Sequence, residues 1–403
     1  MLKKQSGFSM IELLIAMTLF LVVIIAATGV FAPLLMSSKQ QASKIETDIE
    51  GIVGLDILRR DIKQAGIGLP WDLNGAVYLE ADNTQNVTLQ DEEWYNDSPG
   101  NVPRALVSGN DDGDGVQGLQ GLPAASDVLV IKSVIIAGND VSRKWAHVNQ
   151  NNIVNEWIPD TDKLETDNRV IVLIPGETRK LHVKFGGSFT TSYVDNDPGD
   201  DALADDAFKA PDAERQYIVY GVAEPANPVN TALRMPFNRA DYYVRTPASG
   251  MPERCAQGTG ILYKGVLIQR TGASNGGGLN ELPIIDCVAD MQVVYGVDND
   301  DDGDFENPAV YFGSTDYYTD DFSLNLTSAE DVRNIRQVRV YILAQEGQRD
   351  PGFTFNNFTC AGNCIKVEDS TVAGLGRDFD LTAITDWANY RWKVYSLVVK
   401  IEG

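Results

Sequence analysis

The stretch GFSMIELLIAM, residues 7–17, opens an apolar run that carries a glutamate, Glu12, near its start. Lys3 and Lys4 precede it, and residues 13–36 contain no charged side chain. As a helix, a run of about 24 residues spans about 36 Å, enough to cross the hydrocarbon core of a bilayer. Because lysines near a span stay in the cytoplasm, the sequence predicts one membrane span with the rest of the chain exported.

An ordinary cleaved secretory signal does not fit this N-terminus. No A-x-A cleavage site follows the apolar region, and the basic leader ends in Gly7 before that region begins. A carboxylate inside a membrane helix costs about 2.5–3.5 kcal/mol at the centre and less near the interface. Glu12 therefore needs a function that offsets its cost.

The run KKQSG followed by FSMIELLIAM resembles the class III signal of type IV prepilins and type II secretion pseudopilins. The resemblance implies that a membrane prepilin peptidase cleaves after Gly7 and methylates the new terminal amine of Phe8. It also implies that Glu12 acts in assembly. Opposite charges attract strongly in a low dielectric, although desolvation offsets much of the gain, so a Phe8 amine meeting Glu12 of a neighbour would set register. The alternative is a plain membrane anchor with a tolerated glutamate.

Helical character continues beyond the span. Ile45, Ile49, Ile52, Val53 and Ile57 recur at spacings near 3.6, which predicts an amphipathic helix that ends near residue 64. The whole helix, residues 8–64, would be roughly 85 Å long, with its Ile45/Ile49/Ile52 face on the globular domain. Glycines weaken helices and proline kinks them, so weak points are expected at Gly29, Pro33, Gly51 and Gly54.

Four segments organise the chain: a leader (1–7), a transmembrane half-helix (8–36), an amphipathic half-helix (37–65) and a β-rich globular domain (66–403). Runs rich in Val, Ile and Tyr predict strands at 127–136, 169–174, 216–223, 261–270, 291–297, 335–345 and 390–401. Polar stretches at 80–125, 137–168 and 188–212 are expected to be loops. The predicted class is α+β, a long helix packed on an antiparallel β-rich domain.

Further stretches resemble PilW-type minor pilins and the related J-type pseudopilins: LRRDIKQAGIGLPW (58–71), CVADMQVVYGVDNDDDGDFE (287–306), and the last two predicted strands. The resemblance implies a non-catalytic subunit of a tip complex that initiates type IV pilus assembly and serves cell adhesion. Implied partners are other minor pilins, the major pilin, the inner-membrane assembly platform and a tip adhesin. The implied location is the inner membrane with a periplasmic domain, then the pilus tip.

The chain is acidic, with a formal net charge of −24 that disfavours nucleic acid as a partner. Alternating aspartates followed by glycine have the rhythm of a calcium loop. The first candidate ligand set is Asp298, Asp300, Asp302, Asp304 and Glu306; the second is Asn110, Asp112 and Asp114. Ala309 stands where a complete EF-hand has glutamate, so the hypothesis is a Ca2+ loop completed from elsewhere. The alternative is that these residues only form turns.

Four cysteines allow three pairings in an exported domain. The favoured pairing joins Cys360 to Cys364 in a tight CAGNC loop, which leaves Cys255 with Cys287. Four free buried thiols are the alternative.

Motifs for hydrolase, zinc protease, P-loop or dinucleotide chemistry do not occur, and the histidines, His147 and His182, stand apart in the sequence. The prediction is therefore a protein that is not an enzyme. Two other functions stay open: a J-type minor pseudopilin of a type II secretion system, and a membrane-anchored calcium-dependent binding domain that never polymerises.

Overall fold

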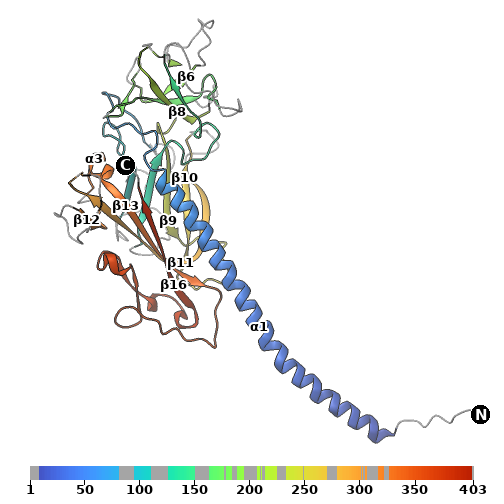
Figure 1. Ribbon diagram of the computed structural model, residues 1–403. Helices are drawn as coiled ribbons and strands as arrows, with labels where there is room; N and C mark the ends of the chain where they lie inside the picture. Colours follow the sequence, from blue (N-terminus) through green and yellow to red (C-terminus); the bar gives the residue numbers. More distant parts are fainter. Residues whose placement is uncertain are drawn as a thin grey trace, which may run out of the picture.

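A long helix and a mainly β-structured body make up the chain (Figure 1). The C-terminal half of the helix, α1 (Met10–Lys63), lies against the body, and the N-terminal half extends away from it. This arrangement agrees with the predicted α+β class. The computed structural model describes residues 9–80, 95–109, 126–149, 163–176, 178–183, 188–194, 207–208, 210, 214–224, 233–247, 249–269, 279–300, 302, 305, 316–321 and 326–401.

Helix α1 is continuous over its 54 residues. Ser9 caps its N-terminus, and the cap at the other end is Gln64, close to the predicted boundary. The backbone stays helical through Gly29 and Pro33, where the sequence predicted a weak point. A helix of this length spans about 80 Å.

The main sheet is antiparallel and contains eight strands among the described residues. Its order is β1 (Leu106–Gly109), β2 (Val128–Ser133), β9 (Asn238–Arg245), β10 (Gly260–Leu267), β11 (Leu279–Asp298), β13 (Ile335–Glu346) and β16 (Arg391–Lys400), with β12 (Asp316–Thr319) paired to β11. The end of α1 packs on one face, where Leu58 and Ile62 join the largest core cluster.

The other face of the main sheet is covered by the chain between β13 and β16. This segment includes β14 (Cys364–Val367) paired with β15 (Arg377–Asp380), and the short helices η3 (Ser370–Val372), η4 (Leu381–Ala383) and η5 (Trp387–Asn389). Phe355, Ile365 and Phe379 pack there against Tyr341 and Trp392 of the sheet. The sheet is thus buried on both sides in this region, which explains its long apolar strands.

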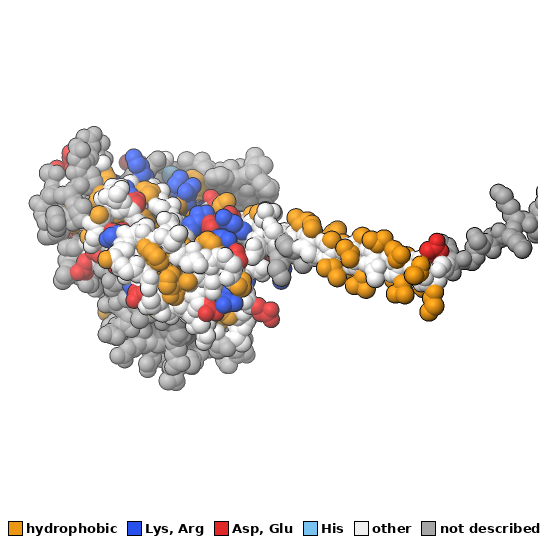
Figure 2. Space-filling model, turned by 90° about the horizontal axis from the view of Figure 1, so that it is seen from below, with side chains coloured by type: hydrophobic (Ala, Val, Ile, Leu, Met, Phe, Trp, Pro, Cys, Tyr) orange, Lys and Arg blue, Asp and Glu red, His pale blue; other side chains and the backbone are white. Residues whose placement is uncertain are grey.

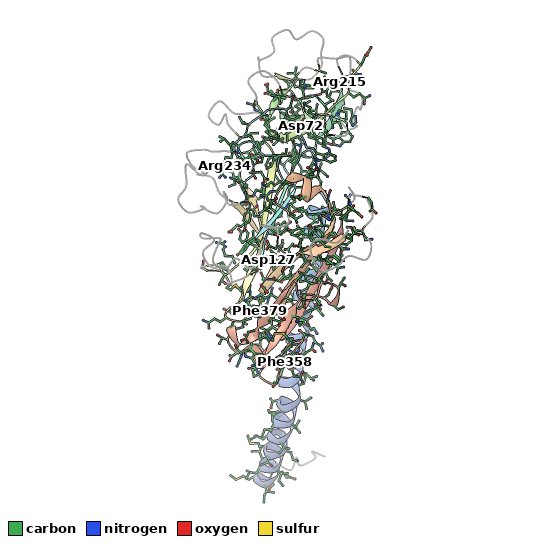
Figure 3. All side chains as sticks on the ribbon, turned by 90° about the vertical axis from the view of Figure 1, so that its left-hand side faces the viewer. Asp72, Asp127, Arg215, Arg234, Phe358 and Phe379 are labelled. Carbon is green, nitrogen blue, oxygen red and sulfur yellow. A yellow bond between two sulfur atoms is a disulfide. The ribbon has the colours of Figure 1, made fainter. Side chains whose placement is uncertain are left out.

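A second, smaller sheet lies at the end of the body farthest from the N-terminus (Figure 1). Its order is β3 (Trp145–Val148), β8 (Tyr217–Ala223), β4 (Arg169–Ile174), β6 (Thr191–Tyr193) and β7 (Ala207–Phe208), with β5 (Lys180–Leu181) paired to β4. Figure 3 shows the resulting length of the body, with Phe358 and Phe379 toward the projecting helix and Asp72 and Arg215 at the opposite end.

Trp71 links the two sheets. Its ring centroid lies 4.7 Å from the guanidinium carbon of Arg179, beside the second sheet, and 4.8 Å from that of Arg333. Arg333 ends the short helix α3 (Ala329–Arg333), which leads into β13 of the main sheet. Cation–π contacts from both arginines to one ring therefore join the two sheets.

All seven predicted strand segments contain strands, but the sequence missed β9, the start of β11 and the shorter strands β5, β12, β14 and β15. Strand β9, which the sequence did not predict, carries the polar residues Asn238, Arg239 and Asp241. It is nevertheless buried in the middle of the main sheet, because Arg239 and Asp241 pair with each other through two hydrogen bonds of 2.8 Å. The stretches predicted as loops also contain the short strands β1, β3, β6 and β7.

Candidate functional site

The N-terminal signal residues precede the helix start. Gly7 and Phe8 lie outside the described residues. Glu12 is exposed in the first turn of α1, and its carboxylate accepts a hydrogen bond of 2.9 Å from the backbone N–H of Ser9. Within one subunit, this carboxylate therefore caps its own helix, where the helix dipole favours negative charge.

The segment Met10–Phe31 is long and apolar enough to cross a membrane, and none of it is buried against the body. Its threonines do not interrupt the apolar surface, because each hydroxyl is satisfied within the helix. The hydroxyl of Thr18 donates to the carbonyl of Ile15 at 2.9 Å, and that of Thr28 donates to the carbonyl of Ile24 at 3.0 Å. Figure 2 shows the hydrophobic side chains along this part of α1.

The prediction that the Ile45/Ile49/Ile52 face of α1 docks on the body is wrong. These side chains are 59%, 56% and 66% exposed, and Val53 beside them is 53% exposed. The docked face is a different one, formed by Thr47, Gly51, Gly54, Leu58 and Ile62.

Small residues let α1 approach the sheet closely. A side-chain carbon added at Gly54 would lie 2.6 Å from Cγ1 of Ile285 and 2.7 Å from the carbonyl oxygen of Ile284. One at Gly51 would lie 3.1 Å from the ring of Tyr395. Two of the three glycines that the sequence marked as weak points, Gly51 and Gly54, are therefore positions where the sheet touches the helix backbone.

Ion pairs flank this contact and complete the docking. Lys44 meets Glu346 at 3.4 Å, and Asp48 meets Lys393 at 3.2 Å. Near the end of the helix, the buried carboxylate of Asp61 lies 2.5 Å from the ammonium of Lys264 and accepts a hydrogen bond from the hydroxyl of Tyr242. Burial, followed by the nearby Asp61 charge, raises the pKa of Tyr242, so its hydroxyl stays protonated and donates.

A network of buried charges lies just beyond the end of α1. The ammonium of Lys132 is fully buried, 2.5 Å from Glu80 and 2.6 Å from Asp97. Asp97 also pairs with Arg104 at 2.7 Å. The carbonyl of Lys132 accepts a hydrogen bond from the N–H of Gly66, which ties the network to the chain leaving α1. The sequence pattern does not predict this network, because its polar residues at 80–125 are typical of a loop.

Two paired strands of the main sheet, β11 and β12, bring together part of the predicted calcium loop. Asp298 ends β11 and is paired in register with Asp316, which begins β12. One carboxylate oxygen each from Asp298, Asp300 and Asp316 lies within 4.8 Å of the others. Asp298 and Asp316 are buried, and Asp298 also pairs with Arg336 at 3.0 Å.

Among the remaining predicted ligands, only Asp302 lies in the part of the chain that the structure describes. Asp302 is described and exposed, but it is not in the cluster. Asp304 and Glu306 lie outside the described residues, as do Asn110, Asp112 and Asp114. Sequence analysis missed Asp316, because only strand pairing brings it next to Asp298.

In the structure, Cys255 is bonded to Cys287 and Cys360 to Cys364, the pairing that the sequence favoured. The first disulfide lies beside α1 and the second lies next to β14. The histidines are in the second sheet, where they pack on aromatic rings. His147 contacts Trp145 with ring centroids 5.2 Å apart, and His182 contacts Tyr217 at the same distance.

Two family models match the chain, one at each end. The prokaryotic N-terminal methylation motif matches residues 2–28, which defines the class as prepilin-like, with the methylation signal on an apolar helix. The type IV pilus-assembly protein W model matches residues 241–403. Together the two matches support assignment of this chain to the PilW-type minor pilins. No curated protein and no solved structure matches the chain.

The PilW match covers most of the main sheet, but not its strands β1 and β2, and none of the second sheet. Residues 241–403 contain β10, β11, β13 and β16, the first disulfide and the acidic cluster. The second sheet, from β3 to β8, lies outside the matched residues. The helix contacts the matched region through β11, β13 and β16.

Proposed function

We propose that this protein is a minor pilin of a tip complex that initiates type IV pilus assembly. The observation that carries the proposal is the exposed face of α1 formed by Ile45, Ile49, Ile52 and Val53, here called the outer stripe. It lies on the helix beside the body, so a membrane span does not account for it. Apolar surface of this kind is used to bind other proteins.

The signal residues have matching roles in this proposal. A prepilin peptidase cleaves after Gly7 and methylates Phe8, and the chain stays in the inner membrane with its body in the periplasm until assembly. The Phe8 amine of one subunit then meets Glu12 of a neighbour in place of the Ser9 cap. Partners are other minor pilins, the major pilin, the assembly platform and a tip adhesin, and the role is structural rather than catalytic.

Mass spectrometry of the protein gently purified from membranes tests the proposal. A methylated Phe8 terminus that co-purifies with minor pilins and a tip adhesin is the expected result. Secretion pseudopilins in their place would move the chain to a type II secretion system. An intact Met1 leader without pilin-like partners would contradict the assembly role.

Substitution of Glu12 separates processing from assembly. Glu12→Val is expected to leave cleavage at Gly7 intact and to reduce recovery of the tip complex, because the neighbour's amine loses its partner. Ser9→Ala is the control, since it removes the local cap but keeps the carboxylate. Normal assembly of Glu12→Val would refute the register role.

We further propose that Ca2+ binds at Asp298, Asp300 and Asp316. Oxygen ligands from closely spaced carboxylates suit this ion, and two of the three are held by paired strands. Added Ca2+ is expected to raise the thermal midpoint of the protein and a chelator to lower it. Asp300→Ala should remove the response, whereas Asp302→Ala, outside the cluster, should keep it. If neither Ca2+ nor the chelator changes the thermal midpoint, the aspartates form only a turn.

A further inference from the structure

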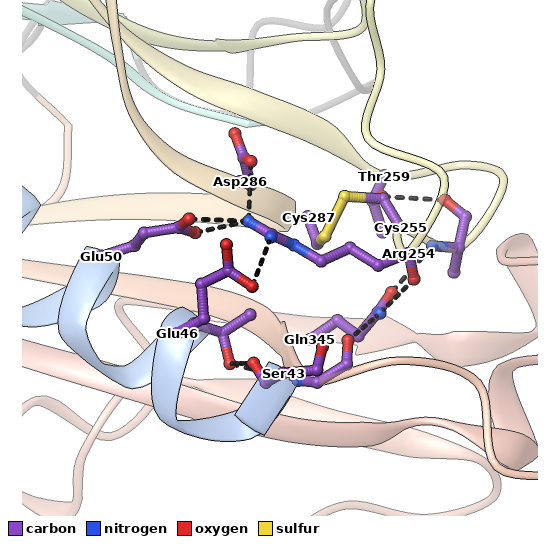
Figure 4. The surroundings of a disulfide bond; sticks show 12 residues. Ser43, Glu46, Glu50, Arg254, Cys255, Thr259, Asp286, Cys287 and Gln345 are labelled. Carbon is purple, nitrogen blue, oxygen red and sulfur yellow. Dashed lines mark hydrogen bonds and ion pairs between the residues drawn. A yellow bond between two sulfur atoms is a disulfide. The ribbon is translucent and has the colours of Figure 1, made fainter. Parts of the chain in front are cut away.

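Arg254 joins the helix to the sheet (Figure 4). One guanidinium nitrogen, Nη1, lies 3.3 Å from the Glu46 carboxylate of α1. The other, Nη2, lies 2.7 Å from Glu50 of α1 and 2.9 Å from Asp286 of β11. Only 17% of the arginine side chain is exposed. One planar cation thus holds two successive turns of the helix and the strand beneath them.

The first disulfide fixes both halves of this contact. Cys255 follows Arg254 in the chain, and Cys287 follows Asp286, so the Cys255–Cys287 bond joins the neighbours of the two paired residues. Figure 4 shows the bond beside the guanidinium. Gln345 adds a third tie, since its side-chain N–H donates to the Arg254 carbonyl at 2.7 Å.

The backbone is irregular on both sides of the disulfide. Cys287 is buried and has a φ of 56°, a left-handed conformation that is costly for a residue with a side chain. Arg254 lies in a turn between β9 and β10 rather than in a strand. Cys287 also lies where the register between β10 and β11 shifts, between Ile285 and Val288, so a covalent link there is a direct way to keep Asp286 and Arg254 facing α1.

The three carboxylates around Arg254 stabilise the charged form of its guanidinium. Burial alone would lower the pKa of Arg254, but Glu50, Asp286 and Glu46 raise it above its ordinary value. The guanidinium therefore stays charged, and neutral substitution would leave three carboxylates facing one another without their shared cation.

We propose that Arg254 is a positioning residue that fixes the rotation of α1 on the body, and that the Cys255–Cys287 disulfide makes this position depend on oxidation. The inference rests on the proposed function, because the fixed rotation turns the outer stripe toward neighbouring subunits. Forming the bond removes two protons and two electrons from the thiols. In thiol–disulfide exchange, an oxidised dithiol partner accepts them. A subunit with reduced cysteines keeps its membrane span, but the rotation of α1 on the body, and with it the direction of the outer stripe, is no longer fixed.

Hydrogen–deuterium exchange on the full chain in detergent tests the proposal. Exchange at residues 44–54 is expected to be about tenfold faster in Arg254→Ala and in Cys255→Ser/Cys287→Ser, while residues 58–63, held by Leu58, Asp61 and Ile62, stay protected. Arg254→Lys should fall between wild type and alanine, because an ammonium can replace part of the charge but not the fork. Cys360→Ser/Cys364→Ser is the matched control, and it should leave residues 44–54 unchanged.

The positioning role of Arg254 and its dependence on oxidation can each be refuted separately. Wild-type exchange in Arg254→Ala would refute the positioning role. Faster exchange in Arg254→Ala but not after reduction of the folded wild-type protein would refute the dependence on oxidation, even if the double serine variant does not fold. Exchange is measured on the isolated subunit, so it tests this inference independently of the proposed function. The exchange result can contradict the inference while co-purification with pilus components supports the proposed function, or the other way round.

Discussion

The two halves of α1 differ in how they use apolar residues. The first half, Met10–Phe31, is apolar around its circumference and touches no other part of the described chain. The second half docks through small, polar and a few apolar residues and leaves Ile45, Ile49, Ile52 and Val53 facing outward. In both halves the apolar side chains are exposed, and the proposed function assigns the first half to the membrane and the second half to neighbouring subunits.

The difference follows from what the sheet offers the helix. Its surface beside α1 carries Lys264, Lys393 and Arg254, which pair with helix carboxylates, and Tyr395, which needs a small residue opposite it. A row of isoleucines would leave these charges unpaired and hold the backbones apart. The helix therefore docks on the face that matches the sheet's charges and close contacts, rather than on its most apolar face.

The largest expected effect on stability comes from Asp61→Ala. Removing a buried carboxylate leaves the Lys264 charge and the Tyr242 hydroxyl without their partner, and such losses cost about 3–5 kcal/mol. Chemical unfolding of the full chain in detergent measures the change. The control is Asp56→Ala on the same helix, whose exposed pair with Arg60 is worth about 0.3–0.5 kcal/mol. Equal, small losses in both variants would mean that α1 is not docked through Asp61.

The next effect tests the close approach at Gly54. Alanine improves helix propensity by about 1 kcal/mol, but its side chain would overlap the Ile284 carbonyl, and overpacking costs about 1–3 kcal/mol. Because backbone cannot yield easily, the cost should outweigh the gain, and Gly54→Ala should lose up to about 2 kcal/mol in unfolding free energy. Gly29→Ala, which meets nothing within 4 Å, should lose none. A stabilised Gly54→Ala would show that helix propensity outweighs contact.

The sequence predicted the features that depend on local patterns, but not those that depend on contacts between distant residues. The signal at Gly7–Glu12, the helix and seven strands follow from local patterns. Periodicity correctly placed the isoleucines on one face, but it could not say which molecule covers that face. Arg239, Asp241 and Asp316 were missed for a related reason, since their pairing depends on residues brought together only by the sheet.

Acid should weaken the body through the network beyond α1. Burial acts to raise the pKa of Asp97, but Lys132 and Arg104 outweigh it and hold the pKa below its ordinary value. The folded state then binds fewer protons than the unfolded state between the two values, so this stabilisation is present above about pH 4 and is lost as the pH falls through the folded pKa. Unfolding measured across this range should show the loss, and Asp97→Asn should flatten it. An unchanged slope in Asp97→Asn would assign the acid response to other carboxylates.

The smallest effect on stability is expected for the outer stripe. Ile45→Ser/Ile49→Ser changes exposed side chains, so the unfolding free energy of the isolated subunit should move by about 0.5 kcal/mol or less. Co-purification of other pilin subunits should nevertheless fall. Ile62→Ser, on the docked face, should instead destabilise the subunit itself. If the double variant still co-purifies with other pilin subunits, the outer stripe does not bind them.

Photo-crosslinking in cells tests the central claim most directly. A photoreactive residue placed at Ile49, on the outer stripe, is expected to capture another pilin-like chain, whereas one at Thr47, on the docked face, should react within the same subunit. Capture of another chain from Ile49 but not from Thr47 would support the claim that one face of α1 docks on the body and the other binds neighbouring subunits. Reaction of Ile49 only with its own body would show that the stripe is covered in the subunit and would contradict the account.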